Sequence, residues 1–148
     1  MASRESAVGR EHEVAPLRMA EQRETLEGSL DARSLARLDD VLAPGDDAVD
    51  VHWQITGARS VDGRPVLVVS LEGALPLVCQ RCLEPFSWPL EQQTRVVLAH
   101  NDAELAALDE ALDDEVILGS KKVGAEALVA DELLLSIPFA PAHADACP

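Results

Sequence analysis

The sequence contains very few aromatic residues. Only 3% of its 148 residues are aromatic, and tyrosine is absent. Apolar residues nevertheless make up 47% of the chain, so the core must be built mainly from Leu, Val and Ala. A platform that stacks RNA bases needs exposed aromatic rings beside basic side chains. Only Arg81 and Arg95 lie near Phe86 and Trp88 in the sequence, so we expect both rings to pack against the core.

The sequence also lacks a long hydrophobic run. A membrane-spanning helix needs roughly 18–20 consecutive apolar residues, and no segment approaches that length. The first residues, MASRESAVGREHEVAP, contain no apolar stretch of the kind found in a secretory signal. Three cysteines, two of them close together, do not resemble the disulfide framework of a secreted protein. We therefore predict a cytoplasmic protein with no membrane partner.

Basic residues are scarce and unevenly distributed. The chain has 12 Lys and Arg against 27 Asp and Glu, a formal net charge of −15. Such a chain repels phosphate backbones and favours basic partners. Half of the basic residues precede position 40, however, so one alternative stays open. It is direct RNA binding by a face that carries four N-terminal arginines: Arg18, Arg23, Arg33 and Arg37.

No catalytic constellation is visible. The glycines form neither of the motifs that cradle phosphates in nucleotide-binding loops. The histidines are scattered along the chain, with no nucleophile and base in a recognisable arrangement. We therefore predict a protein that is not an enzyme.

The length is that of one domain. We expect residues 1–13 to be a disordered leader and residues 14–148 to form the domain. Residues 14–22 could form a short strand, and the 3–4 spacing of apolar residues predicts a short amphipathic helix over 31–42. Alternating residues and an Asp-Gly turn signal predict antiparallel strands within 48–99. Good helix formers predict a helix over 123–138 that stops at Pro138.

These elements predict an α+β fold. It would be an antiparallel sheet or partial β-barrel, packed by a C-terminal helix and one short N-terminal helix. Between the last strand and the C-terminal helix lies an acidic segment, at about 101–115, with seven acids and no base from residue 102 onward. We interpret it as a solvated loop or frayed helix; a docking face for a basic partner is the alternative.

Two cysteines stand in the stretch LPLVCQRCLEPFSWPL. Cys79 and Cys82 have the C-x2-C spacing with which one tight turn can present two thiolates to zinc. His143 and Cys147, in HADAC, could complete a Cys3His structural zinc site. A redox pair is disfavoured, because Pro85 and Pro89 prevent a regular helix after Cys82. The remaining alternative is a structural turn in which the cysteines act as small apolar residues.

LVCQRCLEPF and, some fifty residues later, DELLLSIPFAPAHADAC together resemble the YceD family, the large ribosomal RNA subunit accumulation proteins. That family combines a C-x-R-C-L-x-P element with an acidic helix, an L-x-L-P-x-x-P-like end and a His/Cys-containing tail. Carried over residue by residue, the resemblance covers the four predicted metal ligands and six further positions: Arg81, Leu83, Pro85, Glu132, Pro138 and Pro141.

The resemblance implies a bacterial ribosome-biogenesis factor linked to synthesis, processing or accumulation of large-subunit ribosomal RNA. The family's genes often neighbour that of a small ribosomal protein, and no catalytic activity is established for it. Together with the acidity of this chain, the resemblance implies a basic ribosomal protein, or a ribosome-assembly or RNA-processing factor, as partner. Contact with ribosomal RNA would then be indirect. Extra tail cysteines in many members imply metal binding in some, so a structural zinc-binding interaction protein remains an alternative.

Overall fold

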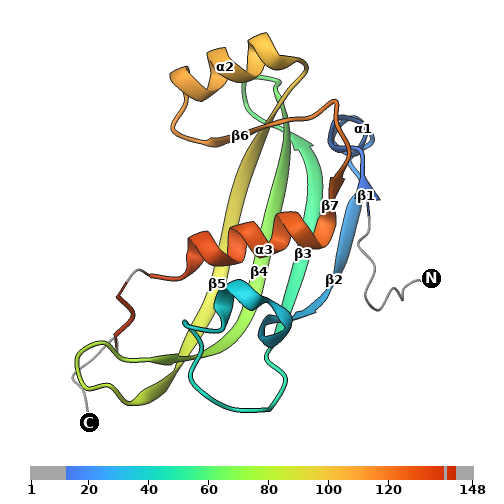
Figure 1. Cartoon of the computed structure of the whole chain (residues 1–148). Helices are drawn as coiled ribbons and strands as arrows, with labels where there is room; N and C mark the ends of the chain where they lie inside the picture. The colour runs from blue at the N-terminus through green and yellow to red at the C-terminus, as the bar shows by residue number, and fades with distance from the viewer. Residues whose placement is uncertain (1–12, 139, 143–148) are drawn as a thin grey trace.

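A curved five-stranded sheet forms the body of the molecule, in a computed structural model that describes residues 13–138 and 140–142 (Figure 1). The strand order is β2-β3-β4-β5-β6, and a separate ribbon pairs β1 with β7. The strands of the large sheet are β2 (Thr25–Asp31), β3 (Asp50–Arg59), β4 (Pro65–Val78), β5 (Pro85–Ala99) and β6 (Glu115–Leu118). All neighbours are antiparallel except β5 and β6. The predicted α+β class is confirmed, and the sheet is open rather than a closed barrel.

The alternation predicted for the first long strand is present in β3. Val51, Trp53 and Ile55 are buried, while the residues between them face the other side of the sheet. The Asp-Gly turn then reverses the chain into β4, with a 2.9 Å hydrogen bond from the N–H of Ser60 to the carbonyl of Arg64. Gly63 has φ 83°, in the left-handed region that glycine adopts without steric cost. Turn and strands together confirm the predicted hairpin.

β4 and β5 continue beyond the rest of the sheet as a two-stranded arm. The pairing of β3 with β4 ends at Val51 and Gly73, whereas β4 and β5 stay paired as far as Val78 and Pro85. The arm projects at the lower left of Figure 1. On its β5 side β6 pairs only with residues 96–99, so Pro85 and Pro89 lie on a strand edge that no described strand covers.

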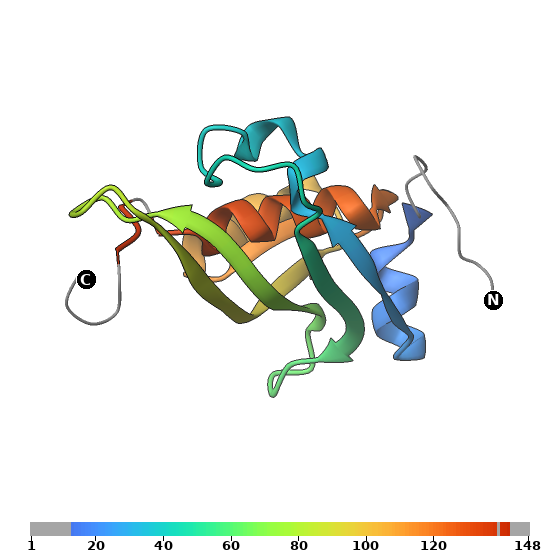
Figure 2. The same ribbon diagram turned by 90° about the horizontal axis from the view of Figure 1, so that it is seen from below.

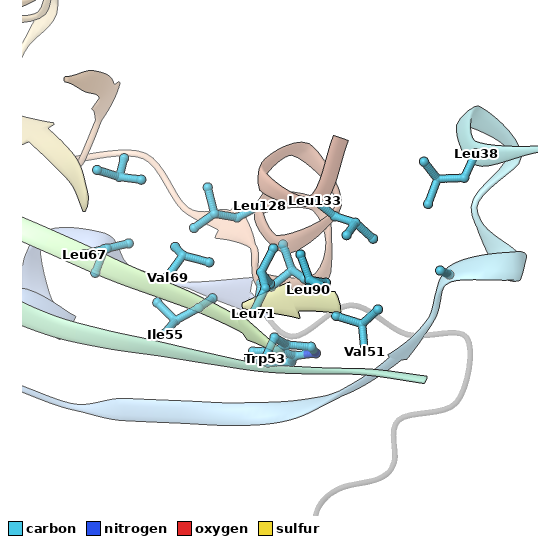
Figure 3. Close-up of a cluster of buried hydrophobic side chains, with 14 of the residues drawn as sticks. Leu38, Val51, Trp53, Ile55, Leu67, Val69, Leu71, Leu90, Leu128 and Leu133 are labelled. Carbon is cyan, nitrogen blue, oxygen red and sulfur yellow. The ribbon is translucent and has the colours of Figure 1, made fainter. Parts of the chain in front are cut away.

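Helix α3 (Ala125–Ser136) lies across the concave face of the sheet and closes the main core (Figure 2). Leu128 and Leu133 of α3 belong to the same buried cluster as Trp53, Leu71 and Leu90 of the sheet (Figure 3). Phe86 and Trp88 are half-buried and pack against the same core, as the sequence predicted. The helix predicted over 123–138 is confirmed, although Val123–Gly124 form strand β7 before it begins.

The acidic segment is a helix rather than a loop. Helix α2 spans Asp102–Ala111, and the Asn101 side chain caps it by accepting a 2.8 Å hydrogen bond from the N–H of Glu104. The Glu104 carboxylate accepts a hydrogen bond from the His100 N–H, which lowers the pKa of Glu104. Leu108 of α2 covers Val66, Val97 and Ala99 on the outer face of the sheet. This apolar contact explains why an acidic sequence folds into an ordered helix here.

Two N-terminal predictions are wrong in detail. Residues 14–22 contain only the end of β1 (Glu13–Val14), followed by helix α1 (Pro16–Gln22), where Pro16 suits the first helical turn. The short N-terminal helix is therefore at 16–22, not 31–42. The latter region forms two 3₁₀ turns, Ala32–Ser34 and Ala36–Leu38, because Leu35 between them is extended at φ −92° and ψ 111°. Apart from Glu13, the predicted leader lies outside the described residues.

Candidate functional site

The turn between β4 and β5 carries both cysteines of the C-x2-C motif. The N–H of Cys79 donates to the carbonyl of Glu84 at 2.9 Å, and the N–H of Leu83 donates to the carbonyl of Cys79 at 2.8 Å. Cys79 is fully buried and Cys82 half-buried, and both carry thiols rather than a disulfide between them. Because β5 begins at Pro85, no helix follows Cys82, so this turn lacks the helix N-terminus that lowers a thiol pKa in redox motifs.

Leu83 adopts an unusual conformation at the tip of the arm. Its φ is 63°, in the left-handed region, and its side chain is 69% exposed. A left-handed conformation is unfavourable for an L-residue other than Gly, Asn or Asp. Arg81 in the same turn is exposed as well. Two of the matching family positions are thus displayed to solvent at the end of a projecting hairpin.

The chain after α3 returns to this turn. The N–H of Gln80 donates a 2.8 Å hydrogen bond to the carbonyl of Pro141, which is buried. A groove of about 400 Å³ lies beside this contact, lined by Val78 of β4, Leu134 and Ile137 at the end of α3, and Val41. The C-x2-C turn and the residues just before His143 are therefore in contact.

The zinc prediction stays a prediction. Two thiols from one tight turn fit half of a tetrahedral site. His143 and Cys147, the other two ligands predicted, lie outside the described residues. Within 13–138 and 140–142, no group of three or more His, Cys, Asp and Glu side chains is arranged to hold a metal ion.

A buried carboxyl group lies under α3. Glu132 is only 2% exposed and is the one charged residue among the buried side chains of the described chain. Its carboxyl faces Glu115 of β6 and Thr94 of β5. Desolvation, followed by the hydrogen bond to Glu115 and the negative charge of that side chain, raises the pKa of Glu132 to about 8. This raised pKa favours the protonated form of the Glu132 carboxyl near neutral pH.

The family resemblance pointed to Glu132, but not to Glu115 and Thr94, which its carboxyl faces. Glu132 falls among the buried residues Leu128, Val129 and Leu133 of α3, and a carboxylate on an otherwise apolar helix face is the signal available in the sequence. Glu115 and Thr94 carry no comparable signal, because their approach depends on the parallel pairing of β6 with β5.

The four arginines of the RNA-binding alternative do not form one face. Arg18 lies on α1 and Arg23 directly follows it, whereas Arg33 and Arg37 come after β2, at the other end of that strand (Figure 1). Arg33 is bound to the carbonyls of Ala43 and Asp47, and Arg37 pairs with Asp131 at 3.1 Å. A continuous basic strip for a phosphate backbone is therefore not formed by these residues.

Comparison with known proteins assigns a family through the C-terminal part of the chain. No helix in the described part of the chain is long and apolar enough to cross a membrane. No curated protein and no solved structure matches the chain significantly. A family model described as "Large ribosomal RNA subunit accumulation protein YceD" matches residues 67–148, more than half of the chain, including the C-x2-C turn and α3. This chain belongs to the YceD family of large ribosomal RNA subunit accumulation proteins.

Proposed function

We propose that this protein is a non-enzymatic ribosome-biogenesis factor that acts in the cytoplasm through contacts with a basic ribosomal protein or a processing factor. Its family name implies a role in the accumulation of large-subunit ribosomal RNA. The observation that carries the choice of partner is the charge of −15. A strongly negative surface attracts basic proteins at long range and disfavours naked RNA.

The distribution of charge in the fold supports this choice. On α2, Asp102, Asp109 and Glu110 are all exposed, so this part of the acidity faces solvent. Complementary charge steers the encounter of two proteins, so this exposed acidity favours a partner with a basic surface.

Sedimentation and capture test the proposal. The tagged protein is expected to co-sediment with a precursor of the large subunit, or to capture a basic ribosomal protein, at low salt. Association should weaken as ionic strength rises, because exposed charges are screened. Loss of the protein should lower the amount of large-subunit RNA relative to small-subunit RNA. No association at low salt, together with an unchanged RNA ratio, would contradict the proposal.

The RNA-binding alternative is tested in the same assay. Substituting Arg18, Arg23, Arg33 and Arg37 by Gln should leave the association unchanged if the partner is a basic protein. Loss of association in this variant, together with loss of binding to purified ribosomal RNA fragments, would favour the alternative.

A further inference from the structure

The outer face of the large sheet is only partly covered. α3 occupies the concave face, and α2 covers the outer face at Val66, Val97 and Ala99. The rest of the outer face forms a shallow groove of about 410 Å³ across β3, β4 and β5. Polar side chains line it, including His52, Gln54, Ser70, Glu72, Glu91 and Gln93.

Two carboxylates in this groove oppose each other directly. The strand register places Glu72 of β4 opposite Glu91 of β5, and His52 of β3 opposite Glu72 on its other side. Both glutamates are exposed. Like charges directly across two antiparallel strands are destabilising.

The surroundings do not neutralise this pair. The described lining of the groove contains no Lys or Arg. His52 lies 3.5 Å from a third carboxylate, that of Glu27, on the far side of β3 from β4. The nearest arginine along β5, Arg95, is committed to Asp114 at 2.7 Å. The free protein thus keeps an unfavourable pair to which the described lining of the groove brings no Lys or Arg.

The chemistry of the groove selects its occupant. It contains no Phe, Tyr or Trp side chain for base stacking, and its carboxylates repel phosphate, so nucleic acid is a poor fit. A guanidinium or ammonium group between the two carboxylates would convert their repulsion into charge-assisted hydrogen bonds. Gln54, Ser70 and Gln93 offer both donors and acceptors to a polypeptide that crosses the strands.

We propose that this groove binds an Arg- and Lys-rich segment of a protein partner, with Glu72 and Glu91 holding one basic side chain between them. The identification of that partner as a ribosome-assembly protein rests on the proposed function. The groove itself is defined by register, charge and lining, and it can be tested without knowing the partner.

The probe is a fluorescent twelve-residue peptide of alternating Arg and Ser, with binding followed by anisotropy at low salt. The test variant is Glu72→Gln with Glu91→Gln, and the matched control is Asp46→Asn with Asp47→Asn, two exposed residues away from the groove, which removes the same charge. We expect the test variant to bind the peptide about tenfold more weakly, since two charge-assisted hydrogen bonds are lost. The control should change affinity less than about twofold. Equal weakening in both variants would overturn the proposal.

Stability provides a second readout. Because the pair is repulsive, the Glu72→Gln, Glu91→Gln variant should unfold at a higher urea concentration than the unaltered protein while binding the peptide less well. A lower urea midpoint would show that the carboxylates serve the fold, and would overturn the proposal. Saturable binding of a fluorescent RNA oligonucleotide to the protein in the absence of the peptide, altered by the same two substitutions, would overturn the choice of a protein partner.

An assay in which the tagged protein captures precursor large subunits distinguishes failure of this inference from failure of the proposed function. If association persists undiminished in the Glu72→Gln, Glu91→Gln variant, the groove is not the docking site, and the proposed function stands. If the unaltered protein associates with no ribosomal precursor but its peptide binding depends on the two glutamates, the groove stands and the proposed function fails.

Discussion

The backbone N–H of Gln80, in the turn between β4 and β5, donates a 2.8 Å hydrogen bond to the carbonyl of Pro141, beyond the end of α3. This contact joins two motifs that are about sixty residues apart in the sequence. It holds the chain two residues before His143 against the turn that carries Cys79 and Cys82. The geometry therefore makes the zinc hypothesis specific enough to test residue by residue.

If the four predicted ligands bind zinc, protein purified without chelators should contain about one zinc per chain by elemental analysis. Cys79→Ser, Cys82→Ser and Cys147→Ser should each abolish most of the bound metal, because a structural site needs all four ligands. Ser87→Ala on the same arm serves as the control and should retain the metal. Metal-free unaltered protein would reject the site, and zinc retained by the Cys147 variant would reject this ligand set.

The buried carboxyl of Glu132 predicts an unusual dependence of stability on pH. Because the pKa of Glu132 is raised to about 8, the folded state binds a proton that the unfolded state releases above its ordinary pKa of 4.5. The free energy of unfolding from this group is therefore highest below pH 4.5 and falls as the pH rises through 8. Glu132→Gln should remove this fall and stabilise the protein at pH 9 by about 1–3 kcal/mol.

Urea unfolding at pH 5, 7 and 9 measures the effect. Asp131→Asn is the control: its exposed charge is the smallest of the causes that raise the pKa of Glu132, so most of the pH dependence should remain in place. An unchanged slope in the Glu132→Gln variant would show that the pKa of Glu132 is not raised in the folded protein.

Gly57 marks the place where α1 approaches the sheet most closely. A Cβ at this position would collide with the backbone of Met19 and Ala20. We expect Gly57→Ala to destabilise the protein by about 3 kcal/mol, the upper end of the usual cost of overpacking. Gly63→Ala, whose Cβ would meet no atom within 4 Å, should cost only about 1 kcal/mol for its positive φ. Amide hydrogen exchange distinguishes the two variants, because only Gly57→Ala should speed exchange at the backbone amides of Met19 and Glu24.

The left-handed conformation of Leu83 predicts that a substitution at this position can stabilise the protein. Asn tolerates the left-handed region better than Leu, so Leu83→Asn should raise the free energy of unfolding by about 0.5–1 kcal/mol. The same change at Leu135 is the matched control. That leucine is 73% exposed but lies within α3, where Asn is a poorer helix former, so its replacement should be slightly destabilising. Effects of the same sign at both positions would contradict the assignment of strain to Leu83.

The sequence predicted elements well where side-chain periodicity was strong. β3 alternates without interruption, and α3 is rich in helix formers, so both were found close to their observed positions. The family assignment depended on residues at fixed spacings, which need no tertiary information. The Asp-Gly turn between β3 and β4 was likewise a local signal, with Gly63 supplying the required positive φ.

The failures arose where tertiary contacts overrode local pattern. Residues 31–42 have helical spacing, but the Asp31 carboxylate binds the N–H groups of both Arg33 and Val49 and ties the segment to the start of β3. α2 was obscured by its acidity, because its ordering depends on the apolar contact of Leu108 with the far side of the sheet. The Glu132–Glu115 pair likewise depends on a parallel pairing that local sequence does not reveal.

Pro85 and Pro89, on the uncovered edge of the arm, oppose self-association of the protein. Cys79 and Glu84 form a hydrogen-bonded pair, so the alternation of an antiparallel ladder makes Val78–Pro85 and Ala74–Pro89 non-hydrogen-bonded pairs. The nitrogens of Pro85 and Pro89 therefore face outward, where any other residue would offer an N–H to an incoming strand. Without those donors the arm is a poor template for the edge-to-edge growth by which sheets aggregate. The protein can thus leave the β5 edge of this hairpin uncovered without inviting other chains to add to it.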